Sequence, residues 1–243
     1  GLKNNLIKNN IYLGKVSRIE PSLQAAFINF GRDRHGFLSF NDIQSDYYQI
    51  PKSDLEEIKK QEEKAREELS KKIAAQEDED IAEGKLEVDD PVEKKNNIDE
   101  NNNIDDEKKT DNRFRFKRYK IQEVIKPNQV ILVQVIKDER GQKGAALSTF
   151  ISIAGKYIVL MPNTAKGGGI SRKIFNPAER KKIRSILNEI EIPKEMGLIV
   201  RTAGSNKTKN EINHDLTTLI NTWNKIKQNA LNSIAPSLIH KES

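Results

Sequence analysis

Alternation of apolar and polar positions predicts β-strands on both sides of a long interruption in the chain. Turn residues such as Pro21 and Gly31 separate the alternating runs. Five short strands with a long break between the third and the fourth predict a small five-stranded β-barrel of the OB type. The break is then a large loop inserted into the barrel, because strands on both sides of it are needed for closure. The expected strands are residues 10–19, 25–30, 36–40, 129–136 and 144–148.

A second unit, at about residues 150–232, mixes strands with helices, so we expect a small α+β domain after the barrel. Residues 156–161 and 197–200 are apolar enough for buried strands. A glycine-rich loop is expected at residues 165–169, between those strands. The predicted fold class is therefore mixed, a β-barrel followed by an α+β domain.

Two helices are expected in this second unit. Asn176 caps the first, Pro177 opens its first turn, and Glu179 is placed to close a capping box. The second helix has its apolar residues on a single face. Trp223 lies on that face, so we expect it in the core rather than on a base-stacking surface. The face comprises Ile212, Leu216, Leu219, Trp223, Ile226 and Ala230.

The insertion, residues 52–112, changes character halfway. Its first half has a thin apolar stripe and charge pairs in the favourable i,i+4 order, such as Glu67 with Lys71, which predict a solvated helix or helical hairpin. Its second half has no aromatic residue and too few apolar ones to offset the entropy of ordering, so we expect disorder at residues 90–112. We interpret the insertion as a tolerated surface loop, with a docking arm for a protein partner as the alternative.

Charge is unevenly distributed along the chain. The formal net charge is +6, but residues 51–110 hold 12 basic and 21 acidic side chains, and the rest hold 30 basic and 15 acidic. A basic body is typical of a protein that binds a polyanion. The absence of cysteine excludes disulfides and thiolate zinc sites within these residues. No apolar run approaches the roughly 18 residues of a membrane span, so a soluble cytoplasmic protein is expected.

Candidate catalytic residues are scarce. The three histidines, His35, His214 and His240, are too scattered for a triad or a metal cluster. No pair of carboxylates in the folded regions has a spacing that indicates metal binding or general acid–base catalysis. On its residues alone, the chain is predicted to be a binding module.

Aromatic side chains on the second and third strands are the first candidate for binding. Phe27, Phe30 and Phe37 lie on or beside the strands that OB folds use for oligonucleotides, and Lys143 supplies charge nearby. The alternative is that phenylalanines fill the barrel interior. Because a strand alternates its faces, the three cannot all point the same way, and surface stacking is expected of Phe27 and Phe37 ahead of Phe30.

A second candidate is an anion site at Arg201 and Thr202. These residues stand between a buried strand and a helix, where backbone N–H groups and the helix dipole favour a negative ligand. A forked guanidinium and a hydroxyl suit a terminal phosphate. The glycine-rich loop and Arg172 could close the other side. The alternative is an ordinary connection between strand and helix.

Several long motifs, in the same order, closely resemble the amino-terminal part of the RNase E/G endoribonucleases. One is Arg34-His35-Gly36-Phe37-Leu38, on the third expected strand. The resemblance covers almost everything outside the insertion, and several motifs together are far more specific than one glycine loop. The others are residues 10–31, 139–147, 160–163, 168–172 and 197–204.

The resemblance implies roles for regions of the chain. Residues 10–148 would be an S-one-type OB domain that binds RNA, and residues 150–232 a sensor for the RNA 5′ end. Residues 1–9 would be a leader or a remnant of a ribonuclease H-like subdomain, and residues 236–243 the start of the return into that subdomain.

The resemblance also implies roles for single residues. Phe27, Phe37 and Lys143 match RNA-contacting positions of the OB domain. Arg201 and Thr202 match the pair that holds a 5′-monophosphate. The positions that border the first nucleotide are Val159, Arg172 and Gly155.

Family enzymes cleave RNA with a magnesium site built from two aspartates and dimerise through a cysteine-bound zinc ion. Both sites would lie beyond Ser243, so this chain is expected to have no catalytic residues and no cofactor, and not to cleave RNA alone. The parent would be a magnesium-dependent endoribonuclease for RNA processing and mRNA decay. It would be a cytoplasmic homo-oligomer, and peripheral association with the inner membrane is compatible with the resemblance.

Within the family, the large insertion favours RNase E over the shorter RNase G. The preferred ligand is single-stranded RNA with a 5′-monophosphate, because a triphosphate overfills a pocket for one phosphate and a hydroxyl leaves its donors unpaired. The alternative is a stand-alone RNA-binding factor that uses the same barrel and is indifferent to the 5′ phosphate.

Overall fold

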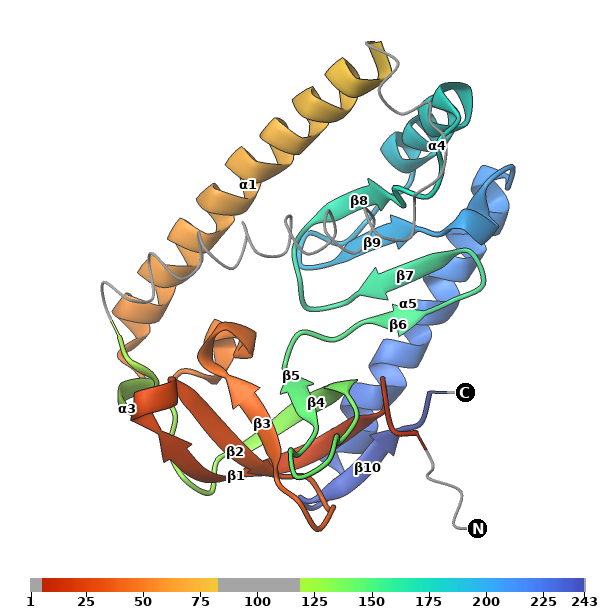
Figure 1. The fold of residues 1–243 in the computed structure, drawn as a ribbon. Coiled ribbons are helices and arrows are strands. Elements are labelled where there is room, and N and C mark those ends of the chain that lie inside the picture. Colours follow the sequence, from red (N-terminus) through yellow and green to blue (C-terminus); the bar gives the residue numbers. More distant parts are fainter. Residues whose placement is uncertain (1–5, 83–118, 243) are drawn as a thin grey trace. The chain divides into compact units, whose positions relative to one another are not determined.

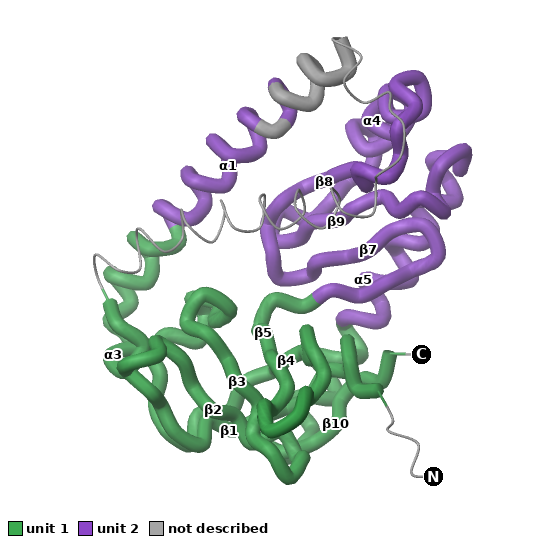
Figure 2. Tube along the Cα trace, viewed as in Figure 1, with its two compact units in different colours: residues 1–59, 112–151, 224–243 green, residues 60–111, 152–223 purple. Residues whose placement is uncertain are grey.

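The computed structural model describes residues 6–82 and 119–242, which divide between two compact units (Figures 1 and 2). Unit 1 comprises residues 1–59, 112–151 and 224–243, and unit 2 comprises residues 60–111 and 152–223. Two helices, α1 (Lys52–Ala82) and α5 (Lys209–Leu231), contribute to both units. The functional roles that the resemblance assigns to these regions stay predictions.

Unit 1 is built on a closed barrel, which confirms the OB-type expectation. Antiparallel pairing joins β1 to β2 and β2 to β3, a parallel pair joins β3 to β5, and antiparallel β4 closes the ring onto β1. All five predicted strands are present near their expected ends. They are β1 (Ile11–Glu20), β2 (Ala25–Asn29), β3 (Gly36–Ser39), β4 (Val130–Lys137) and β5 (Ala146–Ser148).

A sixth strand, β10 (Ser237–His240), extends this sheet from the far end of the chain. It pairs antiparallel with the start of β1, where Tyr12 faces Leu238. The side chain of Asn10 accepts a hydrogen bond from the N–H of Glu242 at 3.0 Å, just beyond the paired residues. The expected ribonuclease H-like identity of this segment stays a prediction.

Apolar side chains from every strand fill the barrel. Where β3 approaches β5, a Cβ added at Gly36 would lie 2.4 Å from Cδ1 of Leu147, so glycine is required for this close packing. Burial of each large aliphatic side chain contributes about 1.5–3 kcal/mol. Core residues of the strands include Val16, Ile28, Leu38, Val133 and Leu147.

Four short helices complete the barrel connections. The short helix α3 (Ile121–Val124) adds two buried side chains to the barrel core. Phe40 directly follows β3, and Tyr48 lies eight residues later. Their ring centroids are 5.8 Å apart. The other short helices are η1 (Pro21–Leu23), η2 (Phe40–Asp42) and η3 (Ser45–Tyr47).

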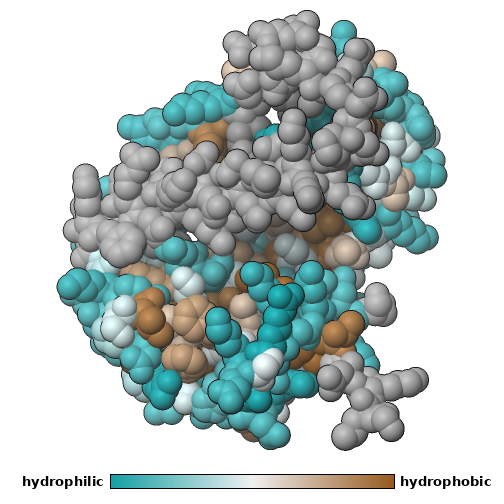
Figure 3. All heavy atoms as spheres, viewed as in Figure 1, coloured by the Kyte–Doolittle hydropathy of each residue, from teal (hydrophilic) through white to brown (hydrophobic). Residues whose placement is uncertain are grey.

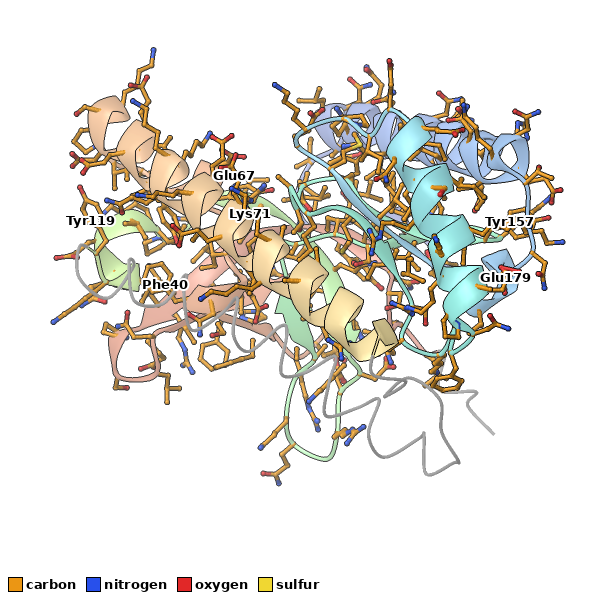
Figure 4. The ribbon with its side chains drawn as sticks, turned by 90° about the horizontal axis from the view of Figure 1, so that it is seen from above. Phe40, Glu67, Lys71, Tyr119, Tyr157 and Glu179 are labelled. Atoms are coloured by element: carbon orange, nitrogen blue, oxygen red, sulfur yellow. The ribbon has the colours of Figure 1, made fainter. Side chains whose placement is uncertain are left out.

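In the described part of the insertion, residues 52–82 form one long helix, α1, which confirms the prediction of a helix in its first half. Ile58 is buried in the core of unit 1. Figure 4 shows Glu67 and Lys71 one turn apart on α1, as the charge pattern predicts. The disorder expected of residues 90–112 lies outside the described residues.

Residues 152–223 of unit 2 form a four-stranded sheet and the helices that accompany it. The strand order is β6-β7-β9-β8, with β8 parallel to β9 and the other pairs antiparallel. The strands are β6 (Ile153–Ala154), β7 (Ile158–Met161), β8 (Gly167–Ile170) and β9 (Gly197–Val200). The helices are α4 (Pro177–Glu189) and α5, and the short helix η4 (Thr202–Gly204) follows β9.

The expectation of a loop at residues 165–169 is wrong, because Gly167–Ile170 form strand β8. Glycine has a low strand propensity, but here the missing side chains allow close packing. A Cβ on Gly168 would lie 3.2 Å from Leu187 of α4 and 3.3 Å from Ile192. Parallel pairing with β9 and this helix contact outweigh the intrinsic preference.

Both predicted helices of this region are confirmed. The side chain of Asn176 accepts hydrogen bonds from the N–H groups of Ala178 and Glu179, at 2.9 and 3.2 Å. The carboxylate of Glu179 accepts from the N–H of Asn206 at 3.4 Å, which joins α4 to the turn before α5. The apolar face of α5 is buried, and Trp223 is only 8% exposed, as predicted for a core residue.

Tyr47 makes the stability of the barrel depend on pH in the alkaline range. Burial raises the pKa of its hydroxyl, which accepts a hydrogen bond from the N–H of Leu132 at 3.1 Å. The folded state therefore holds the phenol proton more tightly than the unfolded state. Its contribution to stability is complete below the ordinary tyrosine pKa of about 10 and is lost as pH rises through the raised value.

We expect the wild-type melting temperature to fall more steeply above about pH 10 than that of Tyr47→Phe. Melting curves recorded from neutral to alkaline pH measure this difference. Parallel declines for the two proteins would contradict the assignment, because the other tyrosines and the lysines are common to both.

Candidate nucleic-acid interface

A row of residues crosses the outer face of the barrel in register. Arg18 on β1 is paired with Phe27 on β2, and Phe27 with Phe37 on β3. The row continues through Ala146 on β5 to Lys137 on β4. Side chains that face each other across neighbouring strands lie on the same face of the sheet. We call this row the barrel strip.

The aromatic rings of the barrel strip are held by each other and by a cation. The rings of Phe27 and Phe37 meet edge to face, with centroids 5.9 Å apart and planes at 75°. The guanidinium of Arg18 lies 4.4 Å from the centroid of the Phe27 ring. Both phenylalanines are half-buried. On the face seen in Figure 3, apolar residues lie among hydrophilic ones over the barrel strands.

Phe30 is not part of this surface, so its inclusion among the RNA-contacting candidates is corrected. It is 1% exposed, and its ring packs edge-on against Tyr12 with centroids 5.1 Å apart. Phe27 and Phe30 are separated by an odd number of positions, so strand alternation sends them to opposite sides.

Lys143 lies in the β4–β5 hairpin, beside the start of β3. The carbonyl of Ala145 accepts a hydrogen bond from the N–H of Phe37 at 2.8 Å. A Cβ on Gly144 would lie 2.1 Å from the carbonyl oxygen of His35, so the hairpin packs tightly on the β2–β3 turn. The exposed Lys143 side chain is therefore carried close to one end of the aromatic pair.

A second group of candidates gathers at one edge of the four-stranded sheet. Strands β8 and β9 are parallel and end together, with Ile170 opposite Val200. The residues that follow, Arg172 on one side and Arg201 with Thr202 on the other, therefore emerge at the same edge. Because β7 is antiparallel to β9, the turn before β7, which includes Gly155, is at this edge too.

Arg201 is held by that turn at two points. Its Nη1 donates to the carbonyl of Gly155 at 2.6 Å, and its backbone N–H donates to the carbonyl of Tyr157 at 2.8 Å. The side chain is exposed, so guanidinium donors other than this one remain accessible to a ligand. Thr202, also exposed, follows directly. We call Gly155, Arg172, Arg201 and Thr202 the edge cluster.

Val159 lies next to the edge cluster on the outer face of the sheet. It is half-buried and is paired with Ile199, which is 37% exposed. The next position on β7, Leu160, points to the opposite face and is fully buried. An apolar surface therefore borders the edge cluster, which suits contact with a nucleobase.

The expectation that an α-helix dipole helps to bind an anion at Arg201 is wrong. The residues after Arg201 form only the three-residue helix η4, and α5 begins at Lys209. A macrodipole acts within the first turn of an α-helix, so it does not reach this position. The anion-binding chemistry of the edge cluster rests on its guanidinium and hydroxyl groups.

Asp215 on α5 is a functional candidate that sequence reasoning missed. It is only 6% exposed, and its carboxylate accepts hydrogen bonds from the N–H groups of Lys156, Tyr157 and Ile158, at 3.2, 2.8 and 3.0 Å. These bonds fix the turn whose Gly155 carbonyl holds Arg201. A Cβ on Gly155 would lie 2.6 Å from the carboxylate, so only glycine fits there.

Arg180 on α4 holds the turn on the other side of the edge cluster, as Asp215 holds the turn at residues 156–158. It is 4% exposed and donates to the carbonyls of Ser171 and Ile174, at 2.9 and 3.0 Å. The turn that carries Arg172 is thereby fixed to α4. Figure 4 shows Tyr157 and Glu179 at the same end of unit 2. Lys207, a second residue that sequence reasoning missed, has its Nζ 5.1 Å from the centroid of the Tyr157 ring.

The metals implied by the resemblance find no ligand group in the part of the chain that the structure describes. Within residues 6–82 and 119–242, no three His, Asp or Glu side chains come together as metal ligands, and the sequence has no cysteine.

The closed mixed barrel with its outward strip defines an OB-fold protein, to which a small α/β unit is joined. A model of the Ribonuclease E/G family matches residues 152–243. Ribonuclease E of Haemophilus influenzae is 36% identical over 236 residues, which are 97% of this chain and 19% of that protein. Ribonuclease E of Escherichia coli is also 36% identical, over 97% of this chain and 16% of that protein. The chain belongs to the ribonuclease E/G family.

Ribonuclease G of Salmonella typhimurium is a more distant relative, 27% identical over 91% of this chain and 33% of that protein. The higher identity to Ribonuclease E agrees with the preference that the insertion indicated. The chain spans less than a fifth of the length of the two Ribonuclease E relatives.

Proposed function

We propose that this chain is the RNA-binding and 5′-end-recognising part of a ribonuclease E-type endoribonuclease. The observation that supports RNA binding best is the barrel strip, in which two aromatic rings stand between cations at Arg18 and Lys137. Bases of a single strand stack on such rings regardless of sequence, at about 1–3 kcal/mol per base, and the cations attract the backbone.

The edge cluster supports recognition of a 5′-monophosphate. Arg201 offers forked donors to phosphate oxygens, and Thr202 adds a hydroxyl. Arg172 approaches from the end of the neighbouring strand β8, while Val159 offers the first nucleotide an apolar surface. Because the Gly155 carbonyl already holds Nη1 of Arg201, the guanidinium is pre-oriented before a ligand arrives.

The role in the parent protein is also a proposal. The parent cleaves RNA in processing and mRNA decay, in the cytoplasm and as a homo-oligomer, with magnesium at a site outside this chain and zinc at another. This chain by itself does not cleave RNA, and incubation of labelled RNA with the purified chain and magnesium tests that statement. No helix in the described ranges has the length and apolar character needed to cross a membrane.

Binding of a short single-stranded RNA, measured by fluorescence anisotropy, tests the RNA-binding part of the proposal. We expect Phe27→Ala and Phe37→Ala each to weaken binding about five- to a hundredfold, because each removes a stacking platform. The salt dependence of binding should stay unchanged, since no charge is lost.

Leu23→Ala is the matched control, because Leu23 is 60% exposed in η1 and does not belong to the barrel strip. Unchanged affinity of the phenylalanine variants, with unchanged melting temperatures, would exclude the barrel strip as the binding surface.

A further inference from the structure

Within residues 152–223, the excess of positive charge is concentrated in one stretch of chain. Residues 166–184 carry seven basic side chains and one acidic side chain, whereas the rest of residues 152–223 carries five of each. The stretch runs from β8 through the turn with Arg172 into the first half of α4. Within residues 152–223, the net positive charge that attracts a polyanion therefore lies in this stretch.

The fold separates these cations into buried and exposed groups. Arg180 is buried against the Ser171–Ile174 turn, and Arg184 donates to the carbonyl of Gly168 at 3.1 Å. Lys173, Lys181 and Lys182 are exposed. Two arginines thus stabilise the protein, while three lysines present their charge to solvent.

Phe175 lies in the turn before α4, two positions after Lys173, and is 37% exposed. Its neighbour Ile174 is buried at 5%, so the turn places one apolar side chain inside and leaves the aromatic ring outside. Asn176 then begins α4. An exposed ring with exposed cations before and after it in the chain is a combination suited to single-stranded nucleic acid, through stacking and backbone attraction.

The outer face of α4 continues this surface. The inner face of the helix, which includes Ile183 and Leu187, is buried. Lys181 and Lys182 lie on the exposed side of the same turns. Glu179, the acidic residue of the stretch, accepts a hydrogen bond from the N–H of Asn206.

We propose that Lys173, Phe175, Lys181 and Lys182 form a second RNA-binding surface, separate from the barrel strip and the edge cluster. Its ligand is single-stranded RNA, with a base stacked on Phe175 and phosphates near the three lysines. The proposal rests on the proposed RNA binding of the chain. This second surface adds affinity for RNA that does not depend on whether the 5′ end carries a phosphate.

The test is anisotropy with a 5′-phosphorylated RNA of about 20 nucleotides, longer than the roughly 4–16 that one OB fold covers. We expect Lys181→Gln with Lys182→Gln to weaken binding severalfold and to reduce the salt slope by about 1.4, at about 0.7 per lost phosphate contact. Phe175→Ala should weaken binding at least about fivefold with an unchanged salt slope. The preference for 5′-phosphate over 5′-hydroxyl should stay unchanged in both.

The matched control is Lys225→Gln with Lys227→Gln, which removes two exposed lysines from α5. Equal losses in the two lysine pairs would reduce the effect to general charge and overturn the proposal. Wild-type affinity of Phe175→Ala and of the Lys181/Lys182 double variant would also overturn the proposal if Phe27→Ala still weakens RNA binding. The proposed function would then stand. A wild-type chain without RNA affinity would overturn both.

Discussion

Arg201→Ala is expected to abolish the preference of this chain for 5′-phosphorylated over 5′-hydroxyl RNA. Hydrogen bonds to a charged group are worth about 1.5–3 kcal/mol, which corresponds to a preference of roughly ten- to a hundredfold in the wild type. Affinity for 5′-hydroxyl RNA should change little, since the barrel strip is intact. Anisotropy with two RNAs that differ only at the 5′ end measures both quantities.

Two further variants sharpen this experiment. Arg201→Lys keeps the charge but loses the fork, so it should retain only part of the preference. Thr202→Val removes the hydroxyl with little change in volume and should cost less than Arg201→Ala. Equal binding of the two RNAs by the wild type would instead support a stand-alone RNA-binding factor that does not read the 5′ end.

Asp215→Ala should be the most destabilising of these changes and should also weaken 5′-end recognition. It leaves three N–H groups of the turn at residues 156–158 without their acceptor, at about 1–3 kcal/mol for each buried group. We expect a loss of about 3–5 kcal/mol in the free energy of unfolding, measured with urea. Arg201 then loses the fixed Gly155 carbonyl, so the preference for 5′-phosphate should fall at temperatures where the variant is folded.

Two controls separate positioning from simple destabilisation. Asp215→Asn keeps one oxygen acceptor for the turn and should retain more stability and more of the preference than Asp215→Ala. Ile183→Ala opens a cavity under α4 at about 2–5 kcal/mol but leaves the turn intact, so it should keep the preference. A loss of preference in Ile183→Ala equal to that in Asp215→Ala would contradict a positioning role.

Strands with clear alternation could be predicted from the sequence, because burial of one face imposes a period of two. The parallel pair between β3 and β5 could not, since nothing within either strand specifies a partner on the far side of the insertion. Strand β8 was missed for a different reason. Its glycines have low strand propensity, and the close contact of Gly168 with Leu187 exists only after α4 has packed.

The candidate site shows the same division. Phe27 and Phe37 could be predicted as an outward pair from strand alternation, and the same argument counted against Phe30. Asp215 gave no local signal, because the N–H groups that it accepts from lie 57 to 59 positions earlier in the chain. In the sequence it is one polar residue beside the apolar face of a long helix.

The pairing of β10 with β1 has a consequence for synthesis on the ribosome. Ile11, Tyr12 and Leu13 leave the ribosome well before their partners in β10, which are translated more than 220 residues later. A nascent barrel can close through β4 and still leave this stretch of β1 without its second neighbour. An unpaired strand edge invites association with other chains. Nascent chains stalled before Ser237 should therefore bind holdase chaperones longer than chains released after His240.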